Sequence, residues 1–234
     1  PSHYKKEGYL PVDPSEVRVR PYLPDIKETR EDLADFYGAI RYTDKWVGKI
    51  LDAIDEAGIA EDTILVFTTD HGASFYHSKA TLYEGGTKVA LLMQWKGKLP
   101  QGKVINGLTS HVDILPTFLS LLGIPVPDYV EGRSFFAELY GDGHTGRQYA
   151  VSEQNYNNHF VPGRAVRTDR YRYIRNGFRI CLFDFLIPEI ELSSSDFRKN
   201  SEVFNFYPAD RYEEELYDLE NDPGERINLV ERPE

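Results

Sequence analysis

The chain has 234 residues, of which 41% are apolar and 28% charged, so it can bury a sizeable core. It carries 27 Lys and Arg against 38 Asp and Glu, a formal net charge of −11. That balance argues against nucleic acid or an anionic membrane as a partner. The single cysteine, Cys181, excludes an intramolecular disulfide and argues against a cysteine-based zinc site. The sequence also has no apolar run long enough to span a membrane.

The N-terminal part predicts an irregular segment followed by one long helix. The first 28 residues contain five prolines and little periodicity. From Leu33 to Ile54, apolar residues then recur at spacings of three and four, which is typical of an amphipathic helix. Thr29–Asp32 predicts a capping box at its start, and Gly58 predicts its end.

The next segments predict strands and helices in alternation. Thr63–Thr69 and Val89–Trp95 are short and almost continuously apolar, so each predicts a buried strand of a parallel sheet. Val112–Leu122 predicts a helix with Pro116 in its first turn, and Ser134–Tyr140 predicts a shorter helix. This order of helix and strand indicates an α/β fold.

The pattern changes near residue 145. Short runs rich in Tyr and Arg predict antiparallel strands joined by tight turns such as Thr168–Arg170. The runs are Tyr149–Glu153, Gly163–Thr168 and Tyr171–Asn176. Residues 188–202 predict a polar surface loop. We therefore expect an α/β domain over residues 1–145 and a small antiparallel α+β subdomain over residues 146–234.

Asp70-His71-Gly72 comes directly after the first predicted strand, at the edge where open α/β sheets bind ligands. A carboxylate and an imidazole there could ligate a metal, and Gly72 would let the backbone turn away. Nine residues after Asp70, Lys79 could hold an anionic group as a point charge. The tripeptide also fits an ordinary turn, and lysines are mostly solvated, so both interpretations stay open.

Two further groups are open to a structural or a functional interpretation. His111 and Asp113 stand at the start of a predicted helix, where Asp113 suits the helix dipole, and we favour a structural role for both. A second group is basic and could form an anion-facing wall, although arginine is also common in surface strands. It consists of His159, Arg164, Arg167, Arg170 and Arg172.

Taken in order, five segments resemble the C-terminal part of a sulfatase of the alkaline-phosphatase-like superfamily. They are Thr68–Gly72 (second metal motif), Lys79–Gly86 (sulfate-binding lysine), Ser110–Thr117 (the following helix), Arg164–Ile174 (small antiparallel sheet) and Glu214–Glu225 (C-terminal signature). Tyr22–Asp25, running into the long helix, looks most like the heparan N-sulfatase (sulfamidase) branch. The fold expected from the resemblance is part of an alkaline-phosphatase-like mixed or parallel sheet with flanking helices, plus the small antiparallel subdomain.

The resemblance implies roles for particular residues. Asp70 and His71 would be ligands of a divalent metal, Ca²⁺ in the family, and Lys79 would contact the sulfate and take part in catalysis. His3 would be a catalytic histidine near the scissile group, and we take His159 and Arg164 from the basic group as candidate substrate contacts. Ca²⁺ prefers oxygen ligands and a transition ion accepts imidazole more readily, so the ion is left open.

Two parts of the family's machinery have no counterpart in this sequence. The family nucleophile is a formylglycine made from Cys or Ser in a Cys/Ser-x-Pro-x-Arg motif, and Cys181 does not fit that motif. The adjacent Asp pair that completes the metal site is also missing. The resemblance thus implies a hydrolase of sulfate esters or sulfamates, acting on sulfated sugars with an upstream formylglycine, and we expect this chain alone to be inactive.

Other interpretations remain open. Phosphomonoesterases and phosphodiesterases of the same superfamily have similar metal sites, and a non-catalytic fragment is a third possibility. Because half a sheet exposes edges and apolar surface, we expect a missing N-terminal half or a second copy as partner. By family, the compartment would be extracytoplasmic: periplasmic, secreted or lysosomal.

Overall fold

The computed structural model describes residues 5–141, 146–157, 159–177 and 212–231, which divide into two compact units. The first unit contains residues 5–63, Phe75–His77 and Tyr212. The second contains Ile64–Ser74 and the described residues of 78–177 and 213–231. The boundary expected near residue 145 stays a prediction.

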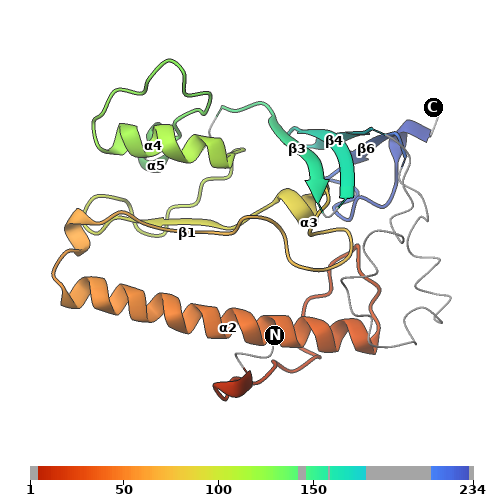
Figure 1. Ribbon diagram of the computed structural model, residues 1–234, viewed down its shortest axis with the longest axis horizontal. Helices are drawn as coiled ribbons and strands as arrows, with labels where there is room; N and C mark the ends of the chain where they lie inside the picture. Colours follow the sequence, from red (N-terminus) through yellow and green to blue (C-terminus); the bar gives the residue numbers. More distant parts are fainter. Residues whose placement is uncertain (1–4, 142–145, 158, 178–211, 232–234) are drawn as a thin grey trace. The chain divides into compact units, whose positions relative to one another are not determined.

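The first unit is built around one long helix, α2 (Lys27–Glu56; Figure 1). The predicted capping box is wrong: Ile26 is the N-cap and no side chain caps the helix. The Ile26 carbonyl already accepts the Arg30 N–H at 3.1 Å, so the helix begins before Thr29. Thr29 lies inside the first turn and is buried there. The predicted end is confirmed, because Gly58 has φ +67° and donates to the Asp55 carbonyl as a left-handed terminus requires.

The core of the first unit joins the start of α2 to the segment before it. Its buried side chains are Val12, Val17, Leu23, Leu33 and Ala34. Phe75, far along the chain, packs edge-on against Phe36 of α2 with ring centroids 5.4 Å apart. A helix that is amphipathic in sequence thus finds its apolar partners in proline-rich coil.

The second unit contains a two-stranded and a four-stranded sheet. In the smaller sheet, β1 (Leu65–Thr68) pairs with β2 (Leu91–Gln94) in antiparallel orientation. The expectation of buried parallel strands is therefore wrong for this pair, and Leu92 is 63% exposed. Apolar runs identify strands but not their direction, and the connection contains only the four-residue helix α3 (Glu84–Thr87) instead of a long crossover helix.

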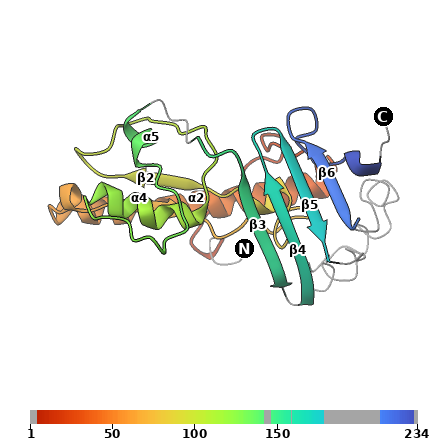
Figure 2. The same ribbon diagram turned by 90° about the horizontal axis from the view of Figure 1, so that it is seen from above.

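The predicted C-terminal antiparallel sheet is confirmed. Its strands lie side by side in chain order (Figure 2): β3 (Ala150–Asn157), β4 (His159–Arg167), β5 (Tyr171–Asn176) and β6 (Glu214–Asp218). A tight turn joins β4 to β5, with the Thr168 N–H donating to the Tyr171 carbonyl at 2.8 Å. The polar loop predicted over residues 188–202 lies outside the described residues.

One face of this sheet covers the segment that leads into α3. The shared core consists of Leu82, Tyr83, Ala165, Ile174 and Tyr217. Along β5 every second residue is buried, so Arg172 shares the inward face with Ile174 and Asn176. The alternation of the strand thereby puts an arginine in the core.

The remaining predicted helices are present. A short 3₁₀ turn (His111–Asp113) leads into α4 (Ile114–Leu121), and α5 (Phe136–Tyr140) lies beside it (Figure 1). Gly123 ends α4 with φ +68°. Within the described ranges, none of the helices combines the length and apolar character that crossing a bilayer requires.

Candidate functional site

A cavity of about 950 Å³ in the second unit brings together the main residues predicted from the sequence. Asp70, His71 and Lys79 all line it. The metal motif and the predicted sulfate lysine therefore open onto one space, as a cation beside an oxyanion would require. Its other walls include the α3 segment, residues before α4, and β3 of the larger sheet.

The Asp70–Gly72 turn follows β1 and orients its two polar side chains. The His71 Nδ1 lies 2.8 Å from the Gly72 carbonyl oxygen, and because a carbonyl only accepts, Nδ1 carries the proton. In the neutral ring, Nε2 then keeps its lone pair 3.3 Å from Asp70 Oδ2. A carboxylate oxygen and an imidazole nitrogen thus stand side by side, facing solvent.

This donor pair fits a divalent cation in part. Two donors are few for Ca²⁺, which takes six to eight oxygen ligands. Within the part of the chain that the structure describes, no group of three or more His, Cys, Asp or Glu side chains could hold a metal. Asp70 and His71 could supply two ligands of a larger set.

Two glycines let the metal motif and the lysine segment touch. The Gly72 N–H donates to the Gly86 carbonyl at 2.9 Å. A Cβ at Gly72 would lie 1.7 Å from the Gly85 oxygen, and one at Gly86 would lie 2.4 Å from the Ser78 oxygen. Both positions therefore need glycine because the backbones approach too closely for a side chain, and not merely because the chain turns there.

Lys79 begins the lysine segment and lies in a tightly held loop. Its N–H donates to the Ala73 carbonyl at 3.0 Å, and the following residue, Ala80, has φ +64°, an uncommon conformation for a residue with a side chain. The lysine is half-buried, and among the described carboxylates none lies within ion-pair distance of its ammonium group. A lysine in this setting is available to an anion that enters the cavity.

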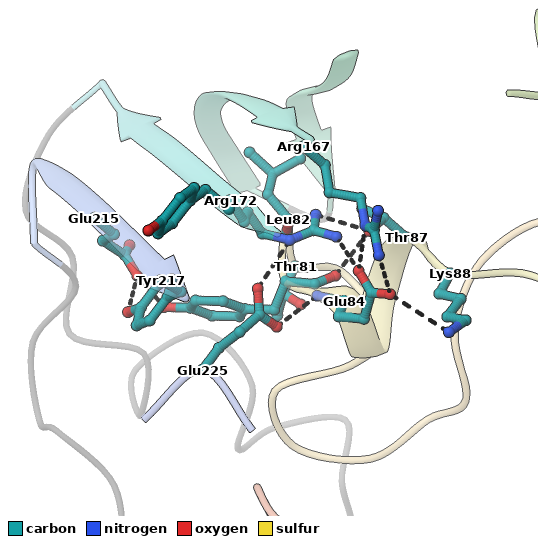
Figure 3. Close-up of polar contacts among 12 residues, drawn as sticks. Thr81, Leu82, Glu84, Thr87, Lys88, Arg167, Arg172, Glu215, Tyr217 and Glu225 are labelled. Atoms are coloured by element: carbon teal, nitrogen blue, oxygen red, sulfur yellow. Dashed lines mark hydrogen bonds and ion pairs between the residues drawn. The ribbon is translucent and has the colours of Figure 1, made fainter. Parts of the chain in front are cut away.

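Beside the lysine loop lies a group of charged side chains that we call the Glu84 cluster: Glu84, Lys88, Arg167, Arg172 and Glu225 (Figure 3). Glu84 faces three cations: Arg172, Arg167 Nε at 3.1 Å and Lys88 Nζ at 3.6 Å. Burial alone would raise the pKa of the Glu84 carboxyl, but Arg167 and Arg172 together hold it below its ordinary value. Glu84 therefore stays ionised and occupies cations that would otherwise face the cavity.

Arg172 and Glu225 are the buried members of the Glu84 cluster, exposed by only 1% and 2%. Their Nε and Oε1 atoms lie 2.9 Å apart as an ion pair without the alignment of a hydrogen bond. The other carboxylate oxygen of Glu225 accepts the Glu84 N–H at 2.6 Å. Burial raises the pKa of Glu225 to about 7, against the opposing charge of Arg172.

A second buried carboxylate, Glu215 of β6, is held by uncharged donors. The hydroxyls of Tyr83 and Tyr217 each donate to its Oε2 at 2.6 Å, and the Asn176 amide donates to Oε1 at 2.6 Å. Burial is the main cause that raises the pKa of Tyr217, with the charge of Glu215 adding to it. Tyr83 thereby anchors the lysine segment to the sheet.

The structural interpretation of Asp113 is confirmed. It is 1% exposed and completes a capping box with Ser110. It also accepts the Arg133 N–H at 2.7 Å and pairs with Arg147. His111 differs, because it lines the cavity with its Nε2 3.0 Å from the Thr68 hydroxyl. The sequence did not single it out as a cavity residue.

The basic group divides into separate environments. Arg167 and Arg172 line the cavity within the Glu84 cluster, whereas Arg170 pairs with Asp218 at 2.7 Å outside it. Arg164, predicted to bind substrate, is not among the lining residues and pairs with Glu153 at 3.1 Å. Glu153 itself lines the cavity, so Arg164 contacts a lining residue without lining the cavity itself.

Two predicted residues cannot be placed. His3 lies outside the described residues, and so does the side chain of His159, whose backbone belongs to β4. Cys181 is likewise outside them.

Sequence reasoning missed the role of Arg172 and Glu225 as buried partners. A usable signal existed for Arg172, because it is in phase with Ile174 on an alternating strand and therefore points to the core. A buried arginine requires a carboxylate, but the sequence does not show that Glu225, 53 residues away by number, supplies it.

Comparisons with known proteins match both halves of the described fold. The sulfatase family profile matches residues 4–124, and a profile described as N-sulphoglucosamine sulphohydrolase, C-terminal, matches residues 71–186. The chain is similar to an ulvan-active sulfatase of Formosa agariphila, with 28% identity over 97% of this chain and 39% of that protein. It is also similar to human N-sulphoglucosamine sulphohydrolase, with 27% identity over 94% of this chain and 48% of that protein.

A solved structure with a similar fold is described as a 2-O GAG sulfatase. It is 26% identical, has a TM-score of 0.60, and the match covers 88% of this chain and 38% of that one. The expected alkaline-phosphatase-like fold class and the resemblance to the sulfamidase branch are therefore confirmed. The chain spans less than half the length of the curated relatives named here.

Proposed function

The chain belongs to the sulfatase family, and on that premise we propose that it forms part of a hydrolase of sulfate esters or sulfamates on sulfated sugars. The observation that carries the proposal is the shared cavity of Asp70, His71 and Lys79. The names of the relatives, which include an ulvan-active sulfatase and an N-sulphoglucosamine sulphohydrolase, support a sulfated sugar as substrate.

In this proposal Lys79 binds the sulfuryl group. The residue is half-buried, precedes the strained backbone of Ala80, and its ammonium group pairs with no described carboxylate. An ammonium group in such a setting neutralises the charge of sulfate oxygens and stabilises the charge that develops as the sulfur–oxygen or sulfur–nitrogen bond breaks. His111 lines the same cavity, with its Nε2 held 3.0 Å from the Thr68 hydroxyl, and could orient the bound group.

Asp70 and His71 would hold the divalent metal, for which Ca²⁺ is the family expectation. The bound ion would neutralise charge on the sulfuryl group and on an attacking oxygen. On the protein side, His71 donates its Nδ1 proton to the Gly72 carbonyl, so in the neutral ring Nε2 is the nitrogen available to an ion beside Asp70. The remaining ligands and the formylglycine are proposed to come from outside this sequence, as is the catalytic histidine if it is not His3.

Because no Cys/Ser-x-Pro-x-Arg motif is present, we propose that the 234-residue chain alone does not turn over substrate. The assay is hydrolysis of an aryl sulfate by the purified chain with added Ca²⁺. Robust turnover would show that another group acts as the nucleophile.

The binding part of the proposal is tested by titrating the chain with inorganic sulfate, inorganic phosphate and glucosamine N-sulfate. Lys79→Gln removes the ammonium and should weaken sulfate binding at least fivefold. Lys98→Gln is the matched control, because Lys98 lies over the Trp95 ring and does not line the cavity. Equal sulfate binding by the wild-type chain and Lys79→Gln would contradict the proposed function, and a preference for phosphate would favour the phosphatase alternative.

A further inference from the structure

Two ionisable side chains of the Glu84 cluster are buried, although such side chains usually lie at the surface. Arg172 comes from β5 and Glu225 from the segment after β6, and both are almost completely removed from water. Burying two charges is costly unless each is paired and hydrogen-bonded. Their polar contacts should therefore show what this arrangement holds in place.

Most of these contacts are made to α3. Arg172 Nη1 donates to the Leu82 carbonyl at 2.7 Å and lies 3.0 Å from the Thr87 hydroxyl, so one guanidinium spans the short helix from before its start to its end. Glu225 accepts the N–H of Glu84, the first residue of α3. Figure 3 shows the two side chains reaching this segment from the sheet and from the C-terminal segment.

α3 in turn contacts both candidate functional motifs. The Gly86 carbonyl accepts the Gly72 N–H, which fixes the turn that carries Asp70 and His71. The Ser78 hydroxyl donates to the Gly85 carbonyl at 2.6 Å, which fixes the residue next to Lys79. A four-residue helix does not hold its own position, so its place depends on these tertiary contacts.

We propose that Arg172 and Glu225 are positioning residues, which hold α3 so that Lys79 and the Asp70–Gly72 turn keep their places around the cavity. This inference rests on the proposed function, because it assigns the C-terminal signature a task in assembling that site. Neither residue is proposed to touch the reacting atoms. The planar guanidinium of Arg172, with its several N–H donors, matters as well as its charge.

The experiment compares amide hydrogen exchange in the 234-residue chain and three variants. Arg172→Lys keeps the charge but loses the planar guanidinium and its several N–H donors, and Glu225→Ala removes the carboxyl group that accepts the Glu84 N–H. Arg170→Lys is the matched control, because Arg170 pairs with Asp218 of the same C-terminal signature without contacting α3. The reporters are the amides of Gly72 and Lys79, with Thr168 of the β4–β5 turn as the reference amide.

We expect both test variants to exchange at least tenfold faster at Gly72 and Lys79 while Thr168 changes less than twofold. Inorganic sulfate should bind at least fivefold more weakly to both, and Arg170→Lys should match the wild-type chain in both measurements. Unchanged exchange at Gly72 and Lys79 would overturn the proposal. Equal acceleration at Thr168, or loss of the fold in both variants, would also overturn it, because the residues would then stabilise the whole unit.

The sulfate titration keeps the two proposals separable. If Lys79→Gln binds sulfate like the wild-type chain, or if neither binds it, the proposed function fails. The exchange rates at Gly72 and Lys79 still decide whether Arg172 and Glu225 hold α3.

Discussion

The Tyr83 hydroxyl donates a 2.6 Å hydrogen bond to the Glu215 carboxylate, although 132 residues separate the two in sequence. Tyr83 precedes α3, and Glu215 belongs to β6, so this bond ties the lysine segment to the C-terminal sheet. Both side chains are buried, where a lost hydrogen bond leaves a desolvated charge partly unsatisfied.

Tyr83→Phe should therefore lower the free energy of unfolding by about 1–3 kcal/mol, measured by urea denaturation. Phe keeps the edge-on packing against Tyr217 and removes only the donor. Tyr173→Phe is the control, since its hydroxyl donates to Glu214 at an exposed position and its loss should cost less than about 0.5 kcal/mol. Similar losses for both variants would contradict the role assigned to Glu215.

Gly72→Ala should destabilise the chain by about 2–4 kcal/mol or displace the Asp70–Gly72 turn, because its Cβ would overlap the Gly85 carbonyl. Gly48→Ala is the opposite case. Gly48 lies inside α2 with nothing near its missing Cβ, so alanine should stabilise the helix by about 0.5–1 kcal/mol. If Gly72→Ala is as well tolerated as Gly48→Ala, the close approach of the two motifs is wrong.

The raised pKa of Glu225 predicts a defined dependence of stability on pH. In the folded chain the carboxyl keeps its proton up to about pH 7, whereas in the unfolded chain it loses the proton near its ordinary pKa of 4.5. The stabilisation is therefore complete below pH 4.5 and is lost as the pH rises through 7. The groups that face Glu225 are Arg172, Glu84 and Glu215.

Between pH 4.5 and 7.5 the wild-type chain should thus lose roughly 3 kcal/mol of unfolding free energy relative to Glu225→Gln, which cannot titrate there. The measurement is the difference in unfolding free energy between the two chains, from urea denaturation at several pH values. In this difference the contributions of the other titratable groups cancel. A difference that stays constant or grows with pH would contradict the environment described for Glu225.

The sequence predicts local features of the fold well. Apolar spacing identifies α2, and Gly58 and Gly123 end their helices because only a residue without a side chain adopts positive φ easily. The alternating runs after residue 145 identify three strands of the larger sheet. Direction is harder to predict, since the apolar runs of β1 and β2 are equally compatible with parallel and antiparallel pairing.

In the candidate site, too, local features can be predicted from the sequence and tertiary contacts cannot. Asp70, His71 and Lys79 are close in sequence, so a motif can suggest that they meet. Glu225 and Arg172 reach α3 only through the pairing of β5 with β6, which is a tertiary event. Arg164 looks like its neighbours in sequence but alternates to the opposite face, where it pairs with Glu153.

The central claim, that Lys79 and the Asp70–Gly72 turn open onto one oxyanion site, is tested most directly by a crystal structure of the chain soaked in selenate. Selenate has the shape and charge of sulfate, and its anomalous signal locates it independently of the surrounding density. The account predicts a selenate within hydrogen-bonding distance of Lys79 Nζ in the cavity lined by Asp70 and His71. Selenate bound elsewhere, with Lys79 Nζ directed out of that cavity, would contradict it.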